Sequence, residues 1–202
     1  TVGPAMPGTE IKIAEDGEIL IKGPGLMAKY WKNPEATDDV LKNGWFHTGD
    51  IGLVESDGSV RITDRKKDII VTAGGKNVAP QNIENLIKTH KLISQIVVHG
   101  DQRKFLSAVV TLDPDALQDF ANANGLGNGS YAALTQKPQV LSAIQDAVDE
   151  FNGQLASYET IKKFKILEQD FSQETGELTP TLKVKRKFVN ERYGEIFSSF
   201  YE

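Results

Sequence analysis

Five consecutive charged residues at positions 64 to 68 (DRKKD) interrupt the apolar pattern of this 202-residue chain. Before them, short alternating runs are separated by turn residues, and after them the apolar residues recur at strand and helix spacing. A chain of this length can form one large domain or two smaller ones. We therefore expect separate units over residues 1 to 63 and 68 to 202, joined by residues 64 to 67.

The part before the charged run predicts a small β unit. Runs at Thr9 to Ile13 and Glu18 to Ile21 flank an Asp-Gly turn, which is a hairpin signal. Ile51 to Glu55 and Ser59 to Thr63 flank a second turn of this kind. A short helix is expected from Pro34 to Leu41, because proline is favoured in the first turn of a helix.

The part after the charged run predicts strands mixed with helices. Ile69 to Val71 is typical of a buried strand, and Ile93 to His99 and Phe105 to Leu112 are expected to pair as antiparallel neighbours. Asp113-Pro114 predicts a capped helix that continues to about Ala123. Apolar residues also recur at helical spacing in three other segments, which are Ile83, Leu86 and Ile87 after Pro80; Val140, Leu141, Ile144, Val148, Phe151 and Leu155; and Phe188, Val189, Tyr193, Ile196, Phe197 and Phe200.

Composition excludes several classes of protein. The net charge of -5 gives no general reason to bind nucleic acid or an anionic membrane. Cysteine is absent, which excludes disulfides and thiolate metal sites and makes the cytoplasm the expected compartment. No apolar run approaches the length of a membrane span, and no signal peptide is expected. Because a turn at residues 1 to 4 leads straight into a patterned strand, we expect the chain to be a fragment.

Four short motifs contain residues that could carry chemistry, and each also has a plain structural explanation. Asp50 follows a glycine turn and could accept two hydrogen bonds from a ribose diol, or could simply belong to a turn. Arg65 could reach a nucleotide or lie in a solvated loop. Gly74 and Gly75 could let backbone lie against an extended ligand, or could form an ordinary turn. Lys183 could stabilise developing negative charge, or could belong to a basic helix start.

The order and spacing of these motifs distinguish between the two explanations. Residues 44–50 (GWFHTGD), 64–70 (DRKKDII), 74–84 (GGKNV through Ile-Glu) and 178–183 (LTPTLK) resemble the adenylate-forming family in unbroken order. The resemblance covers the whole chain, including residues 17 to 31. The last motif is most similar to that of bacterial long-chain fatty acyl-CoA synthetases.

The resemblance implies an α+β fold, in which a small mixed sheet flanked by helices forms a mobile C-terminal lid domain. Residues 1 to 63 would be the β subdomain that ends the large N-terminal domain. Asp50 would bind the ribose hydroxyls of ATP or AMP, and Arg65 would contact the same nucleotide. Lys183 would be the lysine required for adenylation.

The same resemblance assigns the second half-reaction and the motion between the two. Gly74 and Gly75 match the loop that lines the pantetheine tunnel, and Lys67 falls at the hinge position. Glu84 matches a motif glutamate whose role is structural. No metal ligand is implied within the chain.

The implied enzyme converts ATP, a fatty acid and CoA, with Mg²⁺, into acyl-CoA, AMP and pyrophosphate through an acyl-adenylate. The chain departs from the family pattern in two ways. Leu182 stands where many members of the family have glycine, which makes the local backbone less permissive. The chain also lacks the phosphate loop and acyl pocket that the family places upstream, so the chain alone is expected to be inactive.

Three alternatives stay open on the sequence. An adenylating ligase could pass the acyl group to a carrier protein instead of CoA, since both acceptors present a phosphopantetheine arm. A non-catalytic module that binds a nucleotide or a partner would also fit the missing phosphate loop. Nucleic-acid binding through residues 183 to 187 is disfavoured by the negative charge and the poor aromatic interleaving. The expected partners are therefore the small-molecule substrates and the missing N-terminal domain, with peripheral attachment to the inner membrane face as an option.

Overall fold

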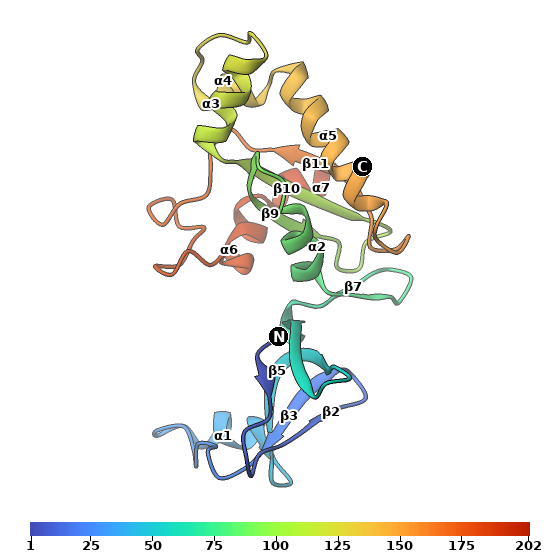
Figure 1. The fold of residues 1–202 in the computed structure, drawn as a ribbon, viewed down its shortest axis with the longest axis vertical. Coiled ribbons are helices and arrows are strands. Elements are labelled where there is room, and N and C mark those ends of the chain that lie inside the picture. The colour runs from blue at the N-terminus through green and yellow to red at the C-terminus, as the bar shows by residue number, and fades with distance from the viewer. The chain divides into compact units, whose positions relative to one another are not determined.

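The computed structural model describes residues 1–202 and divides them into two compact units, Thr1–Ile69 and Ile70–Glu202 (Figure 1). The expected linker, residues 64 to 67, lies just before this division. The second unit mixes strands and helices, and the first is a β sheet with one short helix, as the sequence predicts.

The first unit is built on one twisted antiparallel sheet with the strand order β1-β6-β5-β3-β2. Its elements are β1 (Gly3–Pro4), β2 (Glu10–Ile13), β3 (Glu18–Lys22), α1 (Pro34–Val40), β4 (Leu41–Lys42), β5 (Trp45–Val54), β6 (Ser59–Arg65) and the 3-10 turn η1 (Lys66–Asp68). Both predicted hairpins are confirmed, because β2 pairs with β3 and β5 with β6. Strand β4 adds a short pairing to β5.

Little of the first unit is buried. Its buried apolar side chains are Ile19, Leu20 and Val60. At Gly52 the strands approach so closely that a Cβ atom would lie 2.2 Å from the Arg61 carbonyl oxygen and 2.7 Å from the Ile19 side chain. Glycine is therefore required there, at the point where the β5–β6 register shifts.

The second unit contains a three-stranded sheet and most of the helices (Figure 1). Its elements are β7 (Ile70–Val71), β8 (Asn77–Val78), α2 (Pro80–Ile87), β9 (Ile93–His99), β10 (Leu106–Leu112), α3 (Pro114–Ala123), α4 (Tyr131–Thr135), α5 (Pro138–Asn152), β11 (Ile161–Ile166), α6 (Arg186–Arg192) and α7 (Gly194–Ser199). Helix α3 begins and ends as predicted, with the Asp113 side chain accepting a hydrogen bond from the Ala116 N–H at 2.8 Å.

The central strand β10 is buried along its whole length. It pairs antiparallel with β9, as predicted, and parallel with β11. On one face of the sheet, Ile96 and Val110 belong to the larger core that α2, α3 and α5 complete. On the other face, Val97 and Val109 pack with residues of the C-terminal helices α6 and α7. Burial on both faces explains why most residues of β10 are apolar, with the buried Ser107 and Thr111 as the exceptions.

The structure differs from the prediction at four places. Strand β11 was not expected, because its basic sequence IKKFKI lies on a sheet edge. Strand β7 is only two residues long and Val71 is exposed. Leu141 points to solvent, since the buried face of α5 contains the neighbouring Val140 instead. The expected last helix is two short helices that meet at Tyr193.

Candidate functional site

Asp50 and Arg65 are brought together by strand pairing in the first unit. They are direct cross-strand partners on β5 and β6, and Arg65 Nε lies 2.9 Å from Asp50 Oδ1. The Asp50 N–H donates to Thr48 Oγ1 at 3.1 Å, and the Thr48 hydroxyl donates to the Ile19 carbonyl at 2.8 Å. Residues 48 to 50 thus form an irregular part of β5 that is held to β3, while both charged groups stay accessible to a ligand.

A buried carboxylate on the neighbouring strand β3, which the sequence did not identify, binds this irregular part of β5. Glu18 is 4% exposed, and its Oε1 accepts a hydrogen bond from the Gly49 N–H at 2.9 Å. Its Oε2 lies 3.0 Å from His47 Nδ1 and 3.0 Å from Lys66 Nζ. Burial raises the pKa of Glu18, but these hydrogen bonds lower it more, so the pKa falls below its ordinary value of 4.5. An ionised Glu18 therefore fixes the glycine turn before Asp50.

The predicted hinge residue, Lys67, follows a residue that is firmly attached to the first unit. Lys66 Nζ lies 2.6 Å from Asp16 Oδ2, and the hydrogen bonds to Asp16 and Glu18 raise the pKa of Lys66. Lys67 is exposed and has no ion pair. Ile70 then belongs to the core of the second unit. The chain from Lys67 to Ile69 is the short connection between these two attachments.

The glycine loop connects β7 and β8 in the second unit. Gly75 has a φ of +73°, and its N–H donates to the Thr72 carbonyl at 2.8 Å. The Thr72 hydroxyl accepts from the Lys76 N–H at 3.1 Å, which closes the loop. Gly74 and Gly75 are both exposed, and no atom lies within 4 Å of a Cβ added at Gly75. Within this unit, Gly75 is required for its backbone conformation and not by crowding.

Lys183 lies on a tight hairpin just before α6. Leu178 and Val184 form an isolated antiparallel bridge, and the Thr179 N–H donates to the Lys183 carbonyl at 2.8 Å. The Lys183 side chain is exposed and its ammonium group has no ion pair. Leu182, at the position where the sequence resemblance leads one to expect glycine, has a φ of +59°. The glycine-type backbone is thus kept although the glycine is absent, at a typical cost of about 1–2 kcal/mol.

Glu177 directly precedes this hairpin, and its buried carboxylate binds side chains on either side of the hairpin, Thr175 before it and Tyr193 and Arg192 after it. It is 1% exposed, and its Oε1 accepts from the Tyr193 hydroxyl at 3.0 Å and lies 3.0 Å from Arg192 Nη1. Burial raises the pKa of Glu177, but hydrogen bonds from Thr175 and Tyr193 and the charge of Arg192 lower it more. Burial, together with the hydrogen bond to Glu177 and its negative charge, raises the pKa of Tyr193 to about 12. The Lys185 N–H donates to the Glu177 carbonyl at 2.8 Å, which closes the base of the hairpin.

Gly74 and Gly75 lie in a different loop from Lys183, although both loops belong to the second unit. In Figure 1 the β7–β8 loop and the loop that precedes α6 project to opposite sides of α2. The structure therefore brings Asp50 and Arg65 together, but separates the lysine hairpin from the glycine loop.

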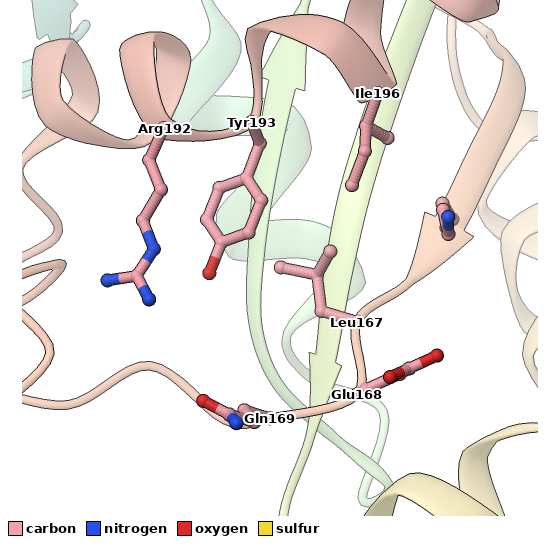
Figure 2. Close-up of a pocket in the computed structure, with 7 residues that line it drawn as sticks. Leu167, Glu168, Gln169, Arg192, Tyr193 and Ile196 are labelled. Carbon is pink, nitrogen blue, oxygen red and sulfur yellow. The ribbon is translucent and has the colours of Figure 1, made fainter.

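Figure 2 shows a cavity of about 390 Å³ between the end of β11 and helices α6 and α7. Tyr193 and Arg192 extend from the helices toward the segment that contains Gln169, and Ile196 faces Leu167. Both Tyr193 and Arg192 bind Glu177, so their polar groups already have partners. We assign no reaction to this cavity.

Residues 1 to 202 contain neither a metal site nor a membrane-spanning helix. No cluster of three or more His, Cys, Asp or Glu side chains is arranged to bind a metal ion. None of the helices has the combination of length and apolar character that crossing a bilayer requires.

Residues 67–202 match the family model described as the AMP-binding enzyme C-terminal domain. The chain is 46% identical over 202 residues to the long-chain-fatty-acid–CoA ligase FadD15 of Mycobacterium tuberculosis, covering 100% of this chain and 34% of that protein. It is 41% identical over 194 residues to long-chain-fatty-acid–CoA ligase 5 of Rattus norvegicus, covering 94% of this chain and 28% of that one. The chain thus spans about a third of the length of the curated relatives it matches.

Solved structures show the same relationship. The adenylation domain of a carboxylate reductase from Mycobacterium chelonae superposes with a TM-score of 0.77 at 27% identity, covering 98% of this chain and 31% of that one. The corresponding domain of a carboxylic acid reductase from Segniliparus rugosus, in complex with AMP and a carboxylic acid, gives 0.76 at 28% identity, covering 98% and 32%.

Proposed function

This chain belongs to the family of AMP-binding enzyme C-terminal domains, and we propose that it provides the lid and the adjoining β subdomain of an ATP-dependent long-chain fatty acid–CoA ligase. The observation that carries the proposal is the 46% identity to a long-chain-fatty-acid–CoA ligase along the entire chain. On this proposal the enzyme first joins the acid carboxylate to the α-phosphate of ATP, which releases pyrophosphate. The thiol of CoA then attacks the acyl-adenylate and releases AMP.

We assign the nucleotide to Asp50 and Arg65. Asp50 Oδ1 already faces Arg65, so the second carboxylate oxygen is the one available to a ribose hydroxyl. Arg65 has further N–H donors that can reach the same nucleotide. Their ion pair is partly exposed, so it stabilises the fold weakly, and its main effect is to orient both groups.

We assign the adenylation step to Lys183. The carboxylate and the phosphate that must approach one another are both anionic, and a fixed cation lowers that barrier. The exposed, unpaired ammonium group on a hairpin with a defined backbone suits this role. Mg²⁺ would enter with ATP, and no step is assigned here to metal ligands of this chain.

We assign the thiol step to the Gly74–Gly75 loop, which offers no charge but lets a narrow pantetheine arm pass close to backbone. Since this loop and the lysine hairpin lie apart on one unit, that unit must turn between the two steps. We place the hinge at Lys67, between the attached Lys66 and the core residue Ile70. The domain limits of 1–63, 64–67 and 68–202 are part of this proposal.

The proposal also covers the cellular location of the enzyme and the acceptor of the acyl group. We place the enzyme in the cytoplasm, with peripheral association at the inner membrane face. The related adenylation domain solved together with a carrier domain from Segniliparus rugosus favours a carrier protein as the alternative acceptor. Comparing CoA with a phosphopantetheinylated carrier as acceptor for the same acyl-adenylate distinguishes the two.

The test uses the full-length enzyme encoded by the gene. Wild-type protein should release pyrophosphate from ATP only when a long-chain acid is present. Lys183→Ala should reduce this release by roughly a hundredfold or more, yet still form thioester from preformed acyl-adenylate and CoA. Gly75→Leu should show the reverse pattern. If both variants fail in the same half-reaction, the alternating lid is the wrong mechanism.

A further inference from the structure

An ion pair that sequence reasoning did not connect to the site lies directly behind the lysine hairpin. Arg186 is the first residue of α6, three residues after Lys183. Its Nη2 donates to Glu84 Oε2 at 2.5 Å, and its Nη1 donates to the Val98 carbonyl at 3.0 Å. The Val98 N–H in turn donates to Glu84 Oε1 at 2.7 Å. The three groups form a closed ring that is largely buried.

This ring joins three parts of the second unit. Arg186 follows the hairpin directly, Glu84 lies on α2, and Val98 lies on the buried strand β9. The backbone leaves the hairpin at Val184, so fixing Arg186 fixes the direction in which the hairpin leaves the core. Glu84 is held independently by α2, whose Ile83 and Ile87 are fully buried.

The pair is not needed merely to hold α6 against the protein. Val189 of this helix is buried in the second core cluster, and Arg192 binds the buried Glu177. A buried ion pair also gives little net stability over apolar residues of similar size, because both charges must be desolvated. Arginine also contributes a planar set of N–H donors, which can bind the Glu84 carboxylate and the Val98 carbonyl together in only one arrangement.

We propose that Arg186 and Glu84 are positioning residues for Lys183, which hold its hairpin in the geometry that adenylation requires. The inference rests on the proposed function and adds two residues to it. Neither side chain touches substrate in this account. Their effect passes through the backbone between Val184 and Arg186.

The position of the pair predicts which half-reaction depends on it. Loss of Arg186 releases the side of the hairpin next to Lys183, whereas the glycine loop keeps its own hydrogen bonds between Thr72 and Lys76. Small displacements of a catalytic group lower kcat, and a shift of about 1 Å can cost roughly a hundredfold. The thiol step does not use the lysine and should be spared.

The test compares Arg186→Met and Glu84→Gln with the matched control Lys187→Met in the full-length enzyme. Lys187 is the adjacent basic residue, is 92% exposed and has only a loose contact with Glu191 at 3.9 Å. Both ring variants should lower kcat for acid-dependent pyrophosphate release by roughly tenfold to a hundredfold with little change in KM for ATP. Thioester formation from preformed acyl-adenylate and CoA should stay near the wild-type rate, and Lys187→Met should match wild type in both assays.

Arg186→Lys is a conservative control in case the Arg186→Met variant does not fold. It keeps the charge, but one ammonium group cannot reproduce the planar contact with Glu84 and Val98, so it should show a smaller loss confined to the same half-reaction. Thermal unfolding of each variant shows whether the fold persists. Equal losses in both half-reactions, or no loss in the first, overturn the positioning role even if Lys183→Ala behaves as proposed. A wild-type enzyme without acid-dependent pyrophosphate release overturns the proposed function and this inference together.

Discussion

The two units both contain a buried glutamate close to a candidate functional segment, but they differ in the size of their apolar cores. Each has a buried glutamate next to a candidate functional segment: the Glu18 carboxylate accepts from the Gly49 N–H in the first unit, and in the second the Glu177 carbonyl accepts from the Lys185 N–H while its carboxylate binds Tyr193. In the first unit, the segment around Asp50 belongs to a sheet with few buried side chains. Val2 and Met6 are largely exposed and, with Asp50, line a hollow of about 220 Å³. The second unit has a sheet that is covered on both faces.

The difference concerns where the stability of each loop originates. In the first unit, hydrogen bonds and ion pairs must hold the Asp50 segment of β5 in place. The buried apolar core of this unit contains only Ile19, Leu20 and Val60. In the second unit, the same kind of polar support is added to an extensive core. The second unit should therefore be an autonomous folding domain, and the first should not.

The largest expected effect comes from separating the units. Residues 70–202 expressed alone should unfold cooperatively, with a free energy of unfolding of about 5–15 kcal/mol, as expected for a domain with its own core. Residues 1–69 alone should have a free energy of unfolding near zero, because so small an apolar core cannot offset the loss of conformational entropy. Circular dichroism during urea titration measures both.

A cooperative transition of similar midpoint in residues 1–69 would break the comparison. The unseparated 202-residue chain is the control, since the transition of its second unit should coincide with that of residues 70–202.

An intermediate effect is expected from the buried glutamate of the second unit. Because the folded-state pKa of Glu177 lies below its ordinary value of 4.5, its contribution to stability is fully present above that pH. This contribution is lost as the pH falls through the lowered pKa. Glu177→Gln should cost about 1–3 kcal/mol at pH 7, and should weaken the dependence of stability on acid.

Urea titrations of residues 70–202 between pH 7 and pH 3 measure this change. The exposed Glu174 offers the matched variant, since Glu174→Gln should leave the profile unchanged. If Glu177→Gln follows the wild-type profile with only a constant offset, the carboxylate is not the group that titrates.

The smallest effect concerns the backbone of the lysine hairpin. Leu182→Gly should relieve the left-handed conformation at φ +59°, while the added freedom of glycine in the unfolded chain opposes part of that gain. The net result should be a stabilisation of residues 70–202 by up to about 1 kcal/mol. The neighbouring Thr181→Gly has no positive φ to relieve and should destabilise the domain, as measured by the same urea titration.

Local signals in the sequence predicted the local structure well. The hairpin of β2 and β3 is confirmed. It was predictable because its turn residues and its alternating apolar residues are close together in the sequence. The capped start of α3 at Asp113 and the apolar face of α2 were predictable for the same reason. The α+β fold class is confirmed.

Interactions between distant segments were not predictable. Strand β11 pairs in parallel with β10 after a long helical crossover, and nothing in its basic sequence indicates that partner. The split of the last helix at Tyr193 places the tyrosine hydroxyl on Glu177, a contact between side chains that periodicity does not describe. The ring formed by Glu84 and Arg186 joins residues about a hundred positions apart.

The same limit applies to the candidate site. Asp50 and Arg65 could be selected as residue types, but their direct pairing across β5 and β6 depends on the register shift at Gly52. Lys183, Gly74, Gly75 and Lys67 came from motif resemblance, and their roles stay predictions until the half-reactions are separated. Glu18 gave no signal, because a buried glutamate has no distinctive sequence pattern.

The two-sided burial of β10 has a consequence for how the protein is made. Val97 and Val109 lie on the face of the sheet that residues between 167 and 200 cover. During synthesis, the strands are therefore complete before the C-terminal residues that cover this face have been made. A nascent chain would pass through a stage with one finished core and one bare apolar sheet surface, which is the kind of intermediate that aggregates or recruits chaperones. Variants that weaken α6 or α7 should therefore lower the yield of soluble protein in cells more than their equilibrium stability suggests.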